Sequence, residues 1–207
     1  MKFLTLIFGN IFYLLLSIII KQLLKIKGFK VGKNFFIKGY PLLTLKAKKT
    51  NIIIGDNVKI LGDIDIRTRE NGSIHIEDNV KIEENCRFVA AREGRINIKK
   101  GAVITTGAII NGGADVIIGE NTIIGPRNGI NANEHNYNLN LKINEQGFIH
   151  KPVYVGKDCW TGANVTIAKG VTIGDKSIIG ANSFVNKDTE IASINGGVPS
   201  KLIKYRN

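Results

Sequence analysis

Aliphatic side chains return every six residues from Val31 almost to the end of the chain, and this period constrains the fold more than any other feature. A six-residue period matches neither the helical period of about 3.6 nor the alternation of a plain strand, but it fits short strands joined by regularly spaced turns. Only Phe88 and Thr161 break the aliphatic rule. The series is Val31, Ile37, Leu43; Ile54, Ile60, Ile66; Ile76, Ile82, Phe88; Ile98, Ile104, Ile110; Ile118, Ile124, Ile130; Val155, Thr161, Ile167, Ile173, Ile179, Val185, Ile191. We therefore expect a solenoid with these side chains inside.

The turns of this solenoid have their own signature. The fourth residue of many hexads is Asn or Gly, which adopt positive φ at low cost, as at Asn57, Asn79, Asn85, Gly101, Gly107, Asn121, Asn164, Gly170 and Asn182. The fifth residue is mostly small or β-branched and is expected to point inward, as at Val58, Val80, Cys86, Ala102, Ala108, Thr122, Cys159, Val165, Val171, Ser177 and Ser183.

Insertions into the repeat all follow the third hexad of a coil. If the coils stack in register, every insertion leaves from the same corner, so one lateral edge of the prism should carry loops. The longest insertion adds 19 residues between Ile130 and Val155. A loop of this length in a compact repeat, here residues 132–152, is uncommon unless it is functional or disordered.

The amino-terminal segment is distinct from the repeat. Residues 3–20 form an uncharged run of eighteen residues, at the lower edge of the roughly 17–25 needed to span a bilayer, and no A-x-A-like cleavage site follows it. On a helical wheel a narrow polar stripe consists of Asn10, Ser17, Lys21 and Lys25. We expect a retained helix in a membrane interface, its lysines on anionic headgroups and the rest of the chain in the cytoplasm. The alternative is a helix that packs over the open end of the solenoid and never meets lipid.

Composition excludes several other classes. The net charge of +12 is spread along the chain and partly concentrated after the apolar segment, without the aromatic interleaving of single-strand binders, so we expect no nucleic-acid partner. Cys86 and Cys159 form neither a disulfide framework nor a CxxC zinc set, which indicates a reducing compartment and two small buried side chains.

The segments IGDNVKI, IGENTII, WTGANVTIAKGVTIGDKSIIGANSFV and GGVPSKLIK resemble the hexapeptide-repeat acyltransferases, including the galactoside, xenobiotic and surface-polysaccharide O-acetyltransferases. The resemblance covers roughly residues 31–204 and is most specific in the carboxy-terminal third. It implies an all-β fold, a left-handed parallel β-helix of about seven triangular coils. The expected organisation is an apolar helix at 1–30, the acyltransferase domain at 31–195 with an extended loop at 132–152, and a short basic cap at 196–207.

The same resemblance implies a catalytic pair. His135 lies in the longest insertion, and Trp160 follows 25 residues later in VGKDCWTGA, a spacing at which the family has its catalytic base. Imidazole titrates near neutral pH and suits removal of a proton from an acceptor hydroxyl as it attacks a thioester. The family pattern assigns the oxyanion contact to the amide of Ala163. Glu134 either orients the imidazole or is solvated, and both alternatives remain open.

The acyl donor implied is acetyl-CoA, with no metal. Family positions for the pantetheine arm are Trp160, Ala163, Ala181, Asn186 and Lys187, and those for the phosphates are Lys201 and Lys204, for which a solvated basic cap is the alternative. The family forms homotrimers with the active site between neighbouring subunits, which is the assembly expected here.

Other functions on this fold are less well supported. Zinc chemistry of the γ-carbonic-anhydrase type needs three converging histidines, and His75, His135 and His150 lack the closely spaced pair. A silent scaffold or membrane-bound assembly factor would not need His135 and Trp160. Fold and base do not select the acceptor. The apolar terminus favours a lipid-linked saccharide at the inner face of the plasma membrane, so we predict an O-acetyltransferase acting on a sugar hydroxyl in capsule, O-antigen or exopolysaccharide biosynthesis. The alternative is a soluble xenobiotic (antibiotic) or amino-sugar acetyltransferase.

Overall fold

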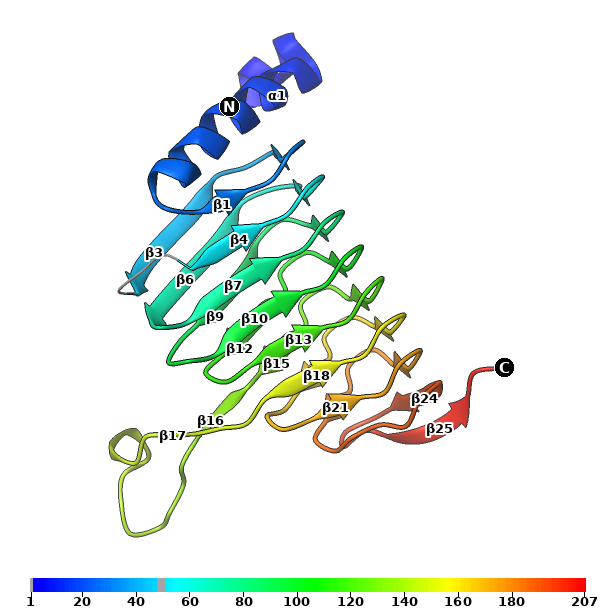
Figure 1. The fold of residues 1–207 in the computed structure, drawn as a ribbon. Coiled ribbons are helices and arrows are strands. Elements are labelled where there is room, and N and C mark those ends of the chain that lie inside the picture. Colours follow the sequence, from blue (N-terminus) through cyan, green and yellow to red (C-terminus); the bar gives the residue numbers. More distant parts are fainter. Residues whose placement is uncertain (1, 48–50) are drawn as a thin grey trace.

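The computed structural model describes the backbone of residues 2–47 and 51–207 and the side chains of residues 9–47 and 51–207. The chain forms a parallel β-solenoid whose amino-terminal end is crossed by one helix, α1 (Lys2–Ile26), as Figure 1 shows. Three sheets run along the solenoid, and each coil contributes one short strand to each sheet. The architecture is the predicted all-β one, with about seven coils, and it agrees with a left-handed β-helix.

The three sheets are named here A, B and C in the order in which the first coil enters them. Sheet A contains β1 (Lys30–Val31), β4 (Ile52–Ile54), β7 (Ser73–Ile76), β10 (Arg95–Ile98), β13 (Val116–Ile118), β18 (Val153–Val155) and β21 (Thr172–Ile173). Sheet B contains β2 (Phe36–Ile37), β5 (Lys59–Ile60), β8 (Lys81–Ile82), β11 (Val103–Ile104), β14 (Ile123–Ile124), β19 (Trp160–Thr161), β22 (Ile178–Ile179), β24 (Ser193–Gly196) and the antiparallel β25 (Lys201–Tyr205). Sheet C contains β3 (Pro41–Ala47), β6 (Ile64–Glu70), β9 (Cys86–Ala90), β12 (Ile109–Gly112), β15 (Gly129–Asn131), β20 (Thr166–Ile167) and β23 (Phe184–Val185).

The core is a column of the side chains that the hexad phase predicts. All of the fifth-position residues named above are buried, and all of the fourth-position residues have positive φ. Cys86 and Cys159 are free and buried as predicted, and burial raises the pKa of the Cys86 thiol to about 11. The prediction that Ile191 points inside is wrong: Ile191 is 66% exposed, because β24 places Ser193 inside instead.

The insertions do leave from one edge, the edge between sheets C and A, but most of them are not loops. They lengthen the strands of sheet C, so that β3 and β6 run to seven residues and pair in register from Pro41–Ile64 to Ala47–Glu70. The extended backbone keeps its hydrogen bonds in this way, whereas loops would have left them to water. The 132–152 insertion forms a hairpin of β16 (Asn133–His135) and β17 (Phe148–His150), with a short 3₁₀ turn, η1 (Ile143–Glu145).

Helix α1 covers the open end of the solenoid with part of its polar stripe, contrary to the expectation that this stripe faces headgroups. Ser17 is 2% exposed, and its hydroxyl accepts a hydrogen bond of 2.8 Å from the Ile37 amide. The Lys21 ammonium donates to the Gly32 carbonyl at 2.5 Å, and Ile20 and Leu24 are buried beside it. The first coil has no preceding coil to pair its backbone, and Ser17 and Lys21 of the helix supply partners for Ile37 and Gly32.

Removing the Ser17 hydroxyl should therefore destabilise the fold. Ser17→Ala leaves the buried Ile37 amide without an acceptor, and we expect a loss of about 1–3 kcal/mol in the free energy of unfolding by chemical denaturation. Asn10→Ala, an exposed change on the same helix, should stay within about 0.5 kcal/mol of the wild type. Equal stability of both variants would contradict this account of the helix.

Candidate active site

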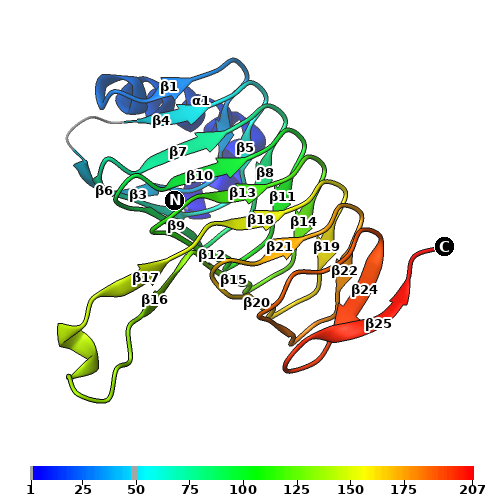
Figure 2. The ribbon, with the colours of Figure 1, turned by 60° about the horizontal axis from the view of Figure 1, so that its bottom comes forward.

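His135 ends the first strand of the projecting hairpin. It is exposed and lies opposite Phe148, with the two ring centroids 4.1 Å apart. The hairpin leaves the solenoid at the edge between sheets C and A, as both Figure 1 and Figure 2 show. The paired backbone gives His135 a fixed place beside the coils, which a disordered loop would not.

Glu134 occupies the opposite face of the hairpin from His135, because neighbouring residues in a strand point to opposite sides. Its carboxylate forms an ion pair with the ammonium of Lys169, which follows β20 at the same edge. Among the described residues no hydrogen bond or ion pair joins the Glu134 carboxylate to His135. Glu134 therefore ties the hairpin to the coils, and it is not placed to orient the imidazole.

A pocket of about 230 Å³ lies at the base of the hairpin. Its lining includes Arg69, Glu70, Arg92, Phe148 and His150. Burial lowers the pKa of His150, with the charge of Arg92 acting in the same direction. Phe148 lines this pocket and also contacts the His135 ring, so it lies between the pocket and the predicted base.

Trp160 lies on sheet B, 52% exposed. Register aligns it across the sheet with Ile178, Ile194 and Lys204 in turn. Three strand spacings of about 4.8 Å put Lys204 about 14 Å from Trp160 along this row. The outer face of sheet B thus carries an aromatic side chain at one end, two half-buried isoleucines and a cation at the other.

The turn after Trp160 presents an unpaired amide. Some third-position turn amides in other coils donate to carboxylates of adjacent coils: Asp56 to Asp78 at 2.7 Å, Thr106 to Glu83 at 3.3 Å and Lys157 to Asp175 at 3.0 Å. Others, such as the amides of Glu84 and Ala181, have no acceptor among the described residues.

Ala163 holds the same turn position, but the residue above it is Ala181, which has no carboxylate. The Ala163 carbonyl accepts from the Asn182 amide at 2.8 Å, whereas its N–H has no acceptor among the residues that the structure describes. An N–H fixed in a turn without a partner suits stabilisation of developing negative charge.

A buried polar network holds this turn and explains why Thr161 breaks the aliphatic rule. The Thr161 hydroxyl accepts hydrogen bonds from the Gly125 amide at 3.0 Å and from the side chain of Asn128 at 2.5 Å. The side-chain oxygen Oδ1 of Asn128 in turn accepts a hydrogen bond from the Val165 amide at 2.7 Å. Both ends of the segment that contains Ala163 are thereby fixed from inside the solenoid.

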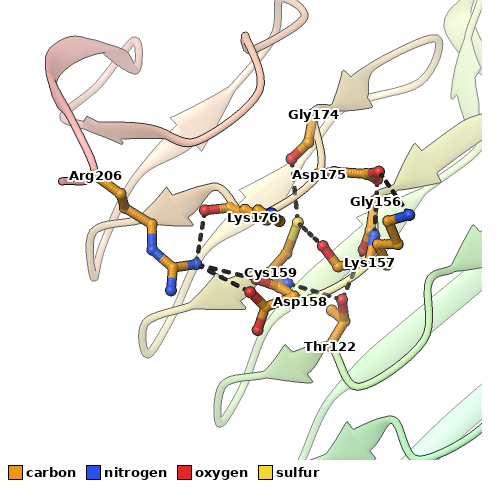
Figure 3. Close-up of polar contacts among 9 residues, drawn as sticks. All are labelled: Thr122, Gly156, Lys157, Asp158, Cys159, Gly174, Asp175, Lys176 and Arg206. Carbon is orange, nitrogen blue, oxygen red and sulfur yellow. Dashed lines mark hydrogen bonds and ion pairs between the residues drawn. The ribbon is translucent and has the colours of Figure 1, made fainter.

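The strand that carries Lys201 and Lys204 is held against the coils by its last residues. Figure 3 shows Arg206 reaching the turn that precedes Trp160. Its guanidinium donates to the carbonyls of Lys176 at 2.9 Å and Asp158 at 3.3 Å and lies 3.4 Å from the Asp158 carboxylate. Both lysines are exposed, and Arg206 keeps them on the same sheet as Trp160.

One chain does not bring the predicted site residues together. Trp160, Ala163, Ala181, Lys201 and Lys204 belong to sheet B or to its corner with sheet C; these five are named the donor group.

Asn186 and Lys187 follow β23 and lie at the far corner, between sheets C and A, where the hairpin with His135 also begins. The width of sheet C, about 15 Å from the residue spacing of strands, separates the two corners. The family positions put Asn186 and Lys187 in the same site between two subunits as Trp160, and in one chain they lie at the corner that carries the hairpin.

Sequence reasoning also did not select Phe148, Lys169, Asn128 or Arg206. The even pairing of 133–135 with 148–150 is the only signal that marks Phe148, and the other three contacts join residues at least 30 positions apart. His75 lies in β7, where burial lowers its pKa. Over residues 9–47 and 51–207 no group of three His, Cys, Asp or Glu side chains is arranged to hold a metal ion.

Comparison with known proteins matches the repeat. A family model described as "Bacterial transferase hexapeptide (six repeats)" matches residues 152–187. A probable macrolide acetyltransferase from Lysinibacillus sphaericus is 56% identical over 52 residues, 25% of this chain and 29% of that protein. The galactoside O-acetyltransferase of Escherichia coli (strain K12) is 43% identical over 56 residues, 27% of this chain and 28% of that protein. The chain thus spans less than a third of the length of these curated relatives.

A solved structure extends the likeness to the fold. A mutant of AntD, an N-acyltransferase from Bacillus cereus solved in complex with dTDP-4-amino-4,6-dideoxyglucose and coenzyme A, superposes with a TM-score of 0.67. The superposition covers 90% of this chain and 89% of that chain, at 23% sequence identity. The resemblance to the hexapeptide-repeat acyltransferases is therefore confirmed, in the repeat by the family model and in the fold by this structure.

Proposed function

We propose that the chain is an acetyl-CoA-dependent O-acetyltransferase that acts on a sugar hydroxyl, with His135 as the general base. The observation that carries the proposal is in segment 152–187, which matches the family: an exposed Trp160 stands beside the unpaired amide of Ala163. The galactoside relative acts on a sugar, and the AntD structure contains coenzyme A. The macrolide relative supports the second candidate, an antibiotic acetyltransferase.

The proposed reaction transfers the acetyl group directly. His135 takes the proton of the acceptor hydroxyl while the oxygen attacks the thioester carbonyl. The Ala163 amide donates to the oxyanion of the tetrahedral intermediate. The intermediate then collapses with cleavage of the carbon–sulfur bond, and the leaving thiolate of coenzyme A takes the proton from His135.

The active site needs two chains, since His135 and the donor group lie at different corners of the prism. A homotrimer with its three-fold axis parallel to the coil stack brings one corner of each chain to the other corner of its neighbour. Each of the three clefts then contains His135 from one subunit and the donor group from the next. The same cleft receives Asn186 and Lys187 from the subunit that supplies His135.

The donor and acceptor sides have different chemistry. The row from Trp160 to Lys204 offers apolar surface for the pantetheine arm and a cation for a phosphate, with Lys201 beside it. On the acceptor side, Phe148 offers a flat apolar surface and the pocket below it has two guanidinium groups and one carboxylate. The excess of positive charge in this pocket favours a saccharide with a carboxylate or phosphate substituent, as in surface-polysaccharide biosynthesis.

Thermal unfolding with acetyl-CoA tests the donor without knowledge of the acceptor. A ligand at 100 times its Kd stabilises the folded state by about 2.7 kcal/mol, which is about 5–10 °C in Tm for a chain of this size. Replacing Lys201 and Lys204 with alanine together should remove most of that shift. Lys33 and Lys59, exposed in the first two coils, provide the matched double substitution, and it should leave the shift unchanged. An unchanged Tm at millimolar acetyl-CoA would refute the proposal that acetyl-CoA is the donor.

A further inference from the structure

We propose that the helix end of the solenoid docks onto an anionic lipid bilayer, with α1 lying in the membrane interface and the coils standing away from it. The outer face of α1 is defined here as the seven apolar side chains that point away from the coils. They are Ile11, Leu14, Leu15, Ile18, Ile19, Leu23 and Ile26, each between 53 and 81% exposed. A contiguous apolar surface of this kind on a soluble domain indicates a missing partner.

The charge of the amino-terminal part of the chain selects the partner: the residues before Asp56 whose side chains the structure describes include seven lysines and neither Asp nor Glu. Residues 1–55 contain 10 lysines and neither Asp nor Glu, so they account for most of the net charge of +12. The sequence expectation named a partial concentration of charge after the apolar segment, and the net charge is concentrated there more strongly than expected. A second copy of the chain docked face to face on the outer face of α1 would bring two such clusters into contact and is disfavoured by repulsion. Anionic headgroups attract each lysine near the surface by about 1 kcal/mol, and the outer face enters the acyl boundary between them.

The face of α1 that packs on the first coil determines whether the helix spans the bilayer or lies in its interface. Segment Gly9–Ile26 is long and apolar enough to cross a membrane by length and composition. However, Ser17, Lys21 and Leu24 along this segment are packed or hydrogen-bonded to the first coil. A helix held along its length by a folded domain lies in the interface and does not span. Part of the predicted polar stripe thus binds the first coil, and the outer face of α1 contacts the lipid.

The trimer strengthens this arrangement, a step that depends on the proposed function. A three-fold axis parallel to the stack places all three copies of α1 at the same end of the assembly. Three outer faces then meet one bilayer at once, and the second and third contacts are intramolecular. The proposed leaflet is the cytoplasmic one, whose lipids are anionic, which places the enzyme at the inner face of the plasma membrane.

The upright orientation determines how far from the membrane an acceptor hydroxyl must extend to reach His135. The hairpin follows β15, the fifth strand of sheet C, four spacings of about 4.8 Å from β3. With a helix diameter of about 10 Å, His135 stands roughly 25–30 Å above the interface. The acceptor is therefore a sugar several units out on a membrane-linked glycan, and not the sugar next to the lipid.

Vesicle flotation tests the docking surface. The full chain should float with phosphatidylglycerol vesicles and much less with phosphatidylcholine vesicles. The double variant Leu15→Glu/Ile19→Glu, both on the outer face, should lose at least tenfold in bound fraction. Leu139 and Ile191, exposed apolar residues far from α1, give the matched control when both are changed to Glu. Equal flotation of the two double variants would overturn the proposal, as would a change in oligomeric state caused by the outer-face variant alone.

The only tryptophan tests the orientation. Trp160 lies on the sixth strand of sheet B, so brominated lipids, which quench at contact, should leave its emission unchanged in the vesicle-bound protein. Ile19→Trp should add an emission that the same lipids quench. Quenching of Trp160 would mean that the solenoid lies along the membrane and would overturn the upright arrangement.

The two proposals can fail separately. Flotation needs no acyl donor, and the acetyl-CoA shift in Tm needs no lipid. Loss of flotation with an intact acetyl-CoA shift would remove the membrane surface and leave the enzyme. Flotation without an acetyl-CoA shift would leave a membrane-docked solenoid of another function.

Discussion

His135→Ala should lower kcat/KM for acetyl transfer by about 10²–10⁴-fold, the usual contribution of a positioned general base. The acceptor hydroxyl would have to attack the thioester without losing its proton to a neighbouring group. The change lies on an exposed hairpin strand, so stability and the acetyl-CoA shift in Tm should be retained. The measurement is coenzyme A release with whichever saccharide supports turnover by the wild type.

Glu134→Gln is the matched control for the His135 substitution. The two residues are adjacent on β16, but the Glu134 carboxylate pairs with Lys169 on the other side of the hairpin. Because exposed ion pairs contribute about 0–1 kcal/mol, we expect kcat/KM within about fivefold of the wild type. Full activity of His135→Ala would refute the base, and an equal loss in both variants would show that hairpin position, and not imidazole chemistry, matters.

The sequence predicted the solenoid well because each coil has one inward aliphatic residue per hexad and a turn residue with positive φ. Both requirements are local, so they can be read from single positions such as Ile60 and Asn57. Errors arose where a coil loses a neighbour. At the amino-terminal end, the wheel showed the stripe of Ser17 and Lys21 but not that it faces unpaired backbone. At the carboxy-terminal end, Ile191 continues the six-residue series in the sequence, but the chain no longer follows the regular coil there and Ser193 points inside instead.

The candidate site was harder to predict because its geometry depends on corners and not on spacing. The interval of 25 residues between His135 and Trp160 identifies both residues, but it does not show that sheet C separates them. The unpaired amide of Ala163 depends on which residues of the neighbouring coils lie beside its turn. Such features follow from the stacking register, which the long insertion at 132–152 obscures in a linear reading.

Mixing two inactive variants should restore activity if the site is shared between subunits. His135→Ala removes the base, and Ala181→Trp, an exposed change on the donor corner, should block the thioester. In trimers assembled at random from equal amounts of both chains, about one quarter of the clefts take His135 from one variant and an open donor corner from the other. Co-expression with two affinity tags should therefore recover about one quarter of wild-type kcat per cleft, from variants that are each nearly inactive.

Placing both substitutions in one chain supplies the control for this experiment. Mixed equally with wild type, such a chain leaves about one quarter of the clefts intact when each site spans two subunits, but about one half when each site lies within one. The separation of His135 from Ala163 by the width of sheet C predicts the first value. Recovery of no activity in the first mixture, together with one half in the second, would mean that the hairpin folds back over its own donor group.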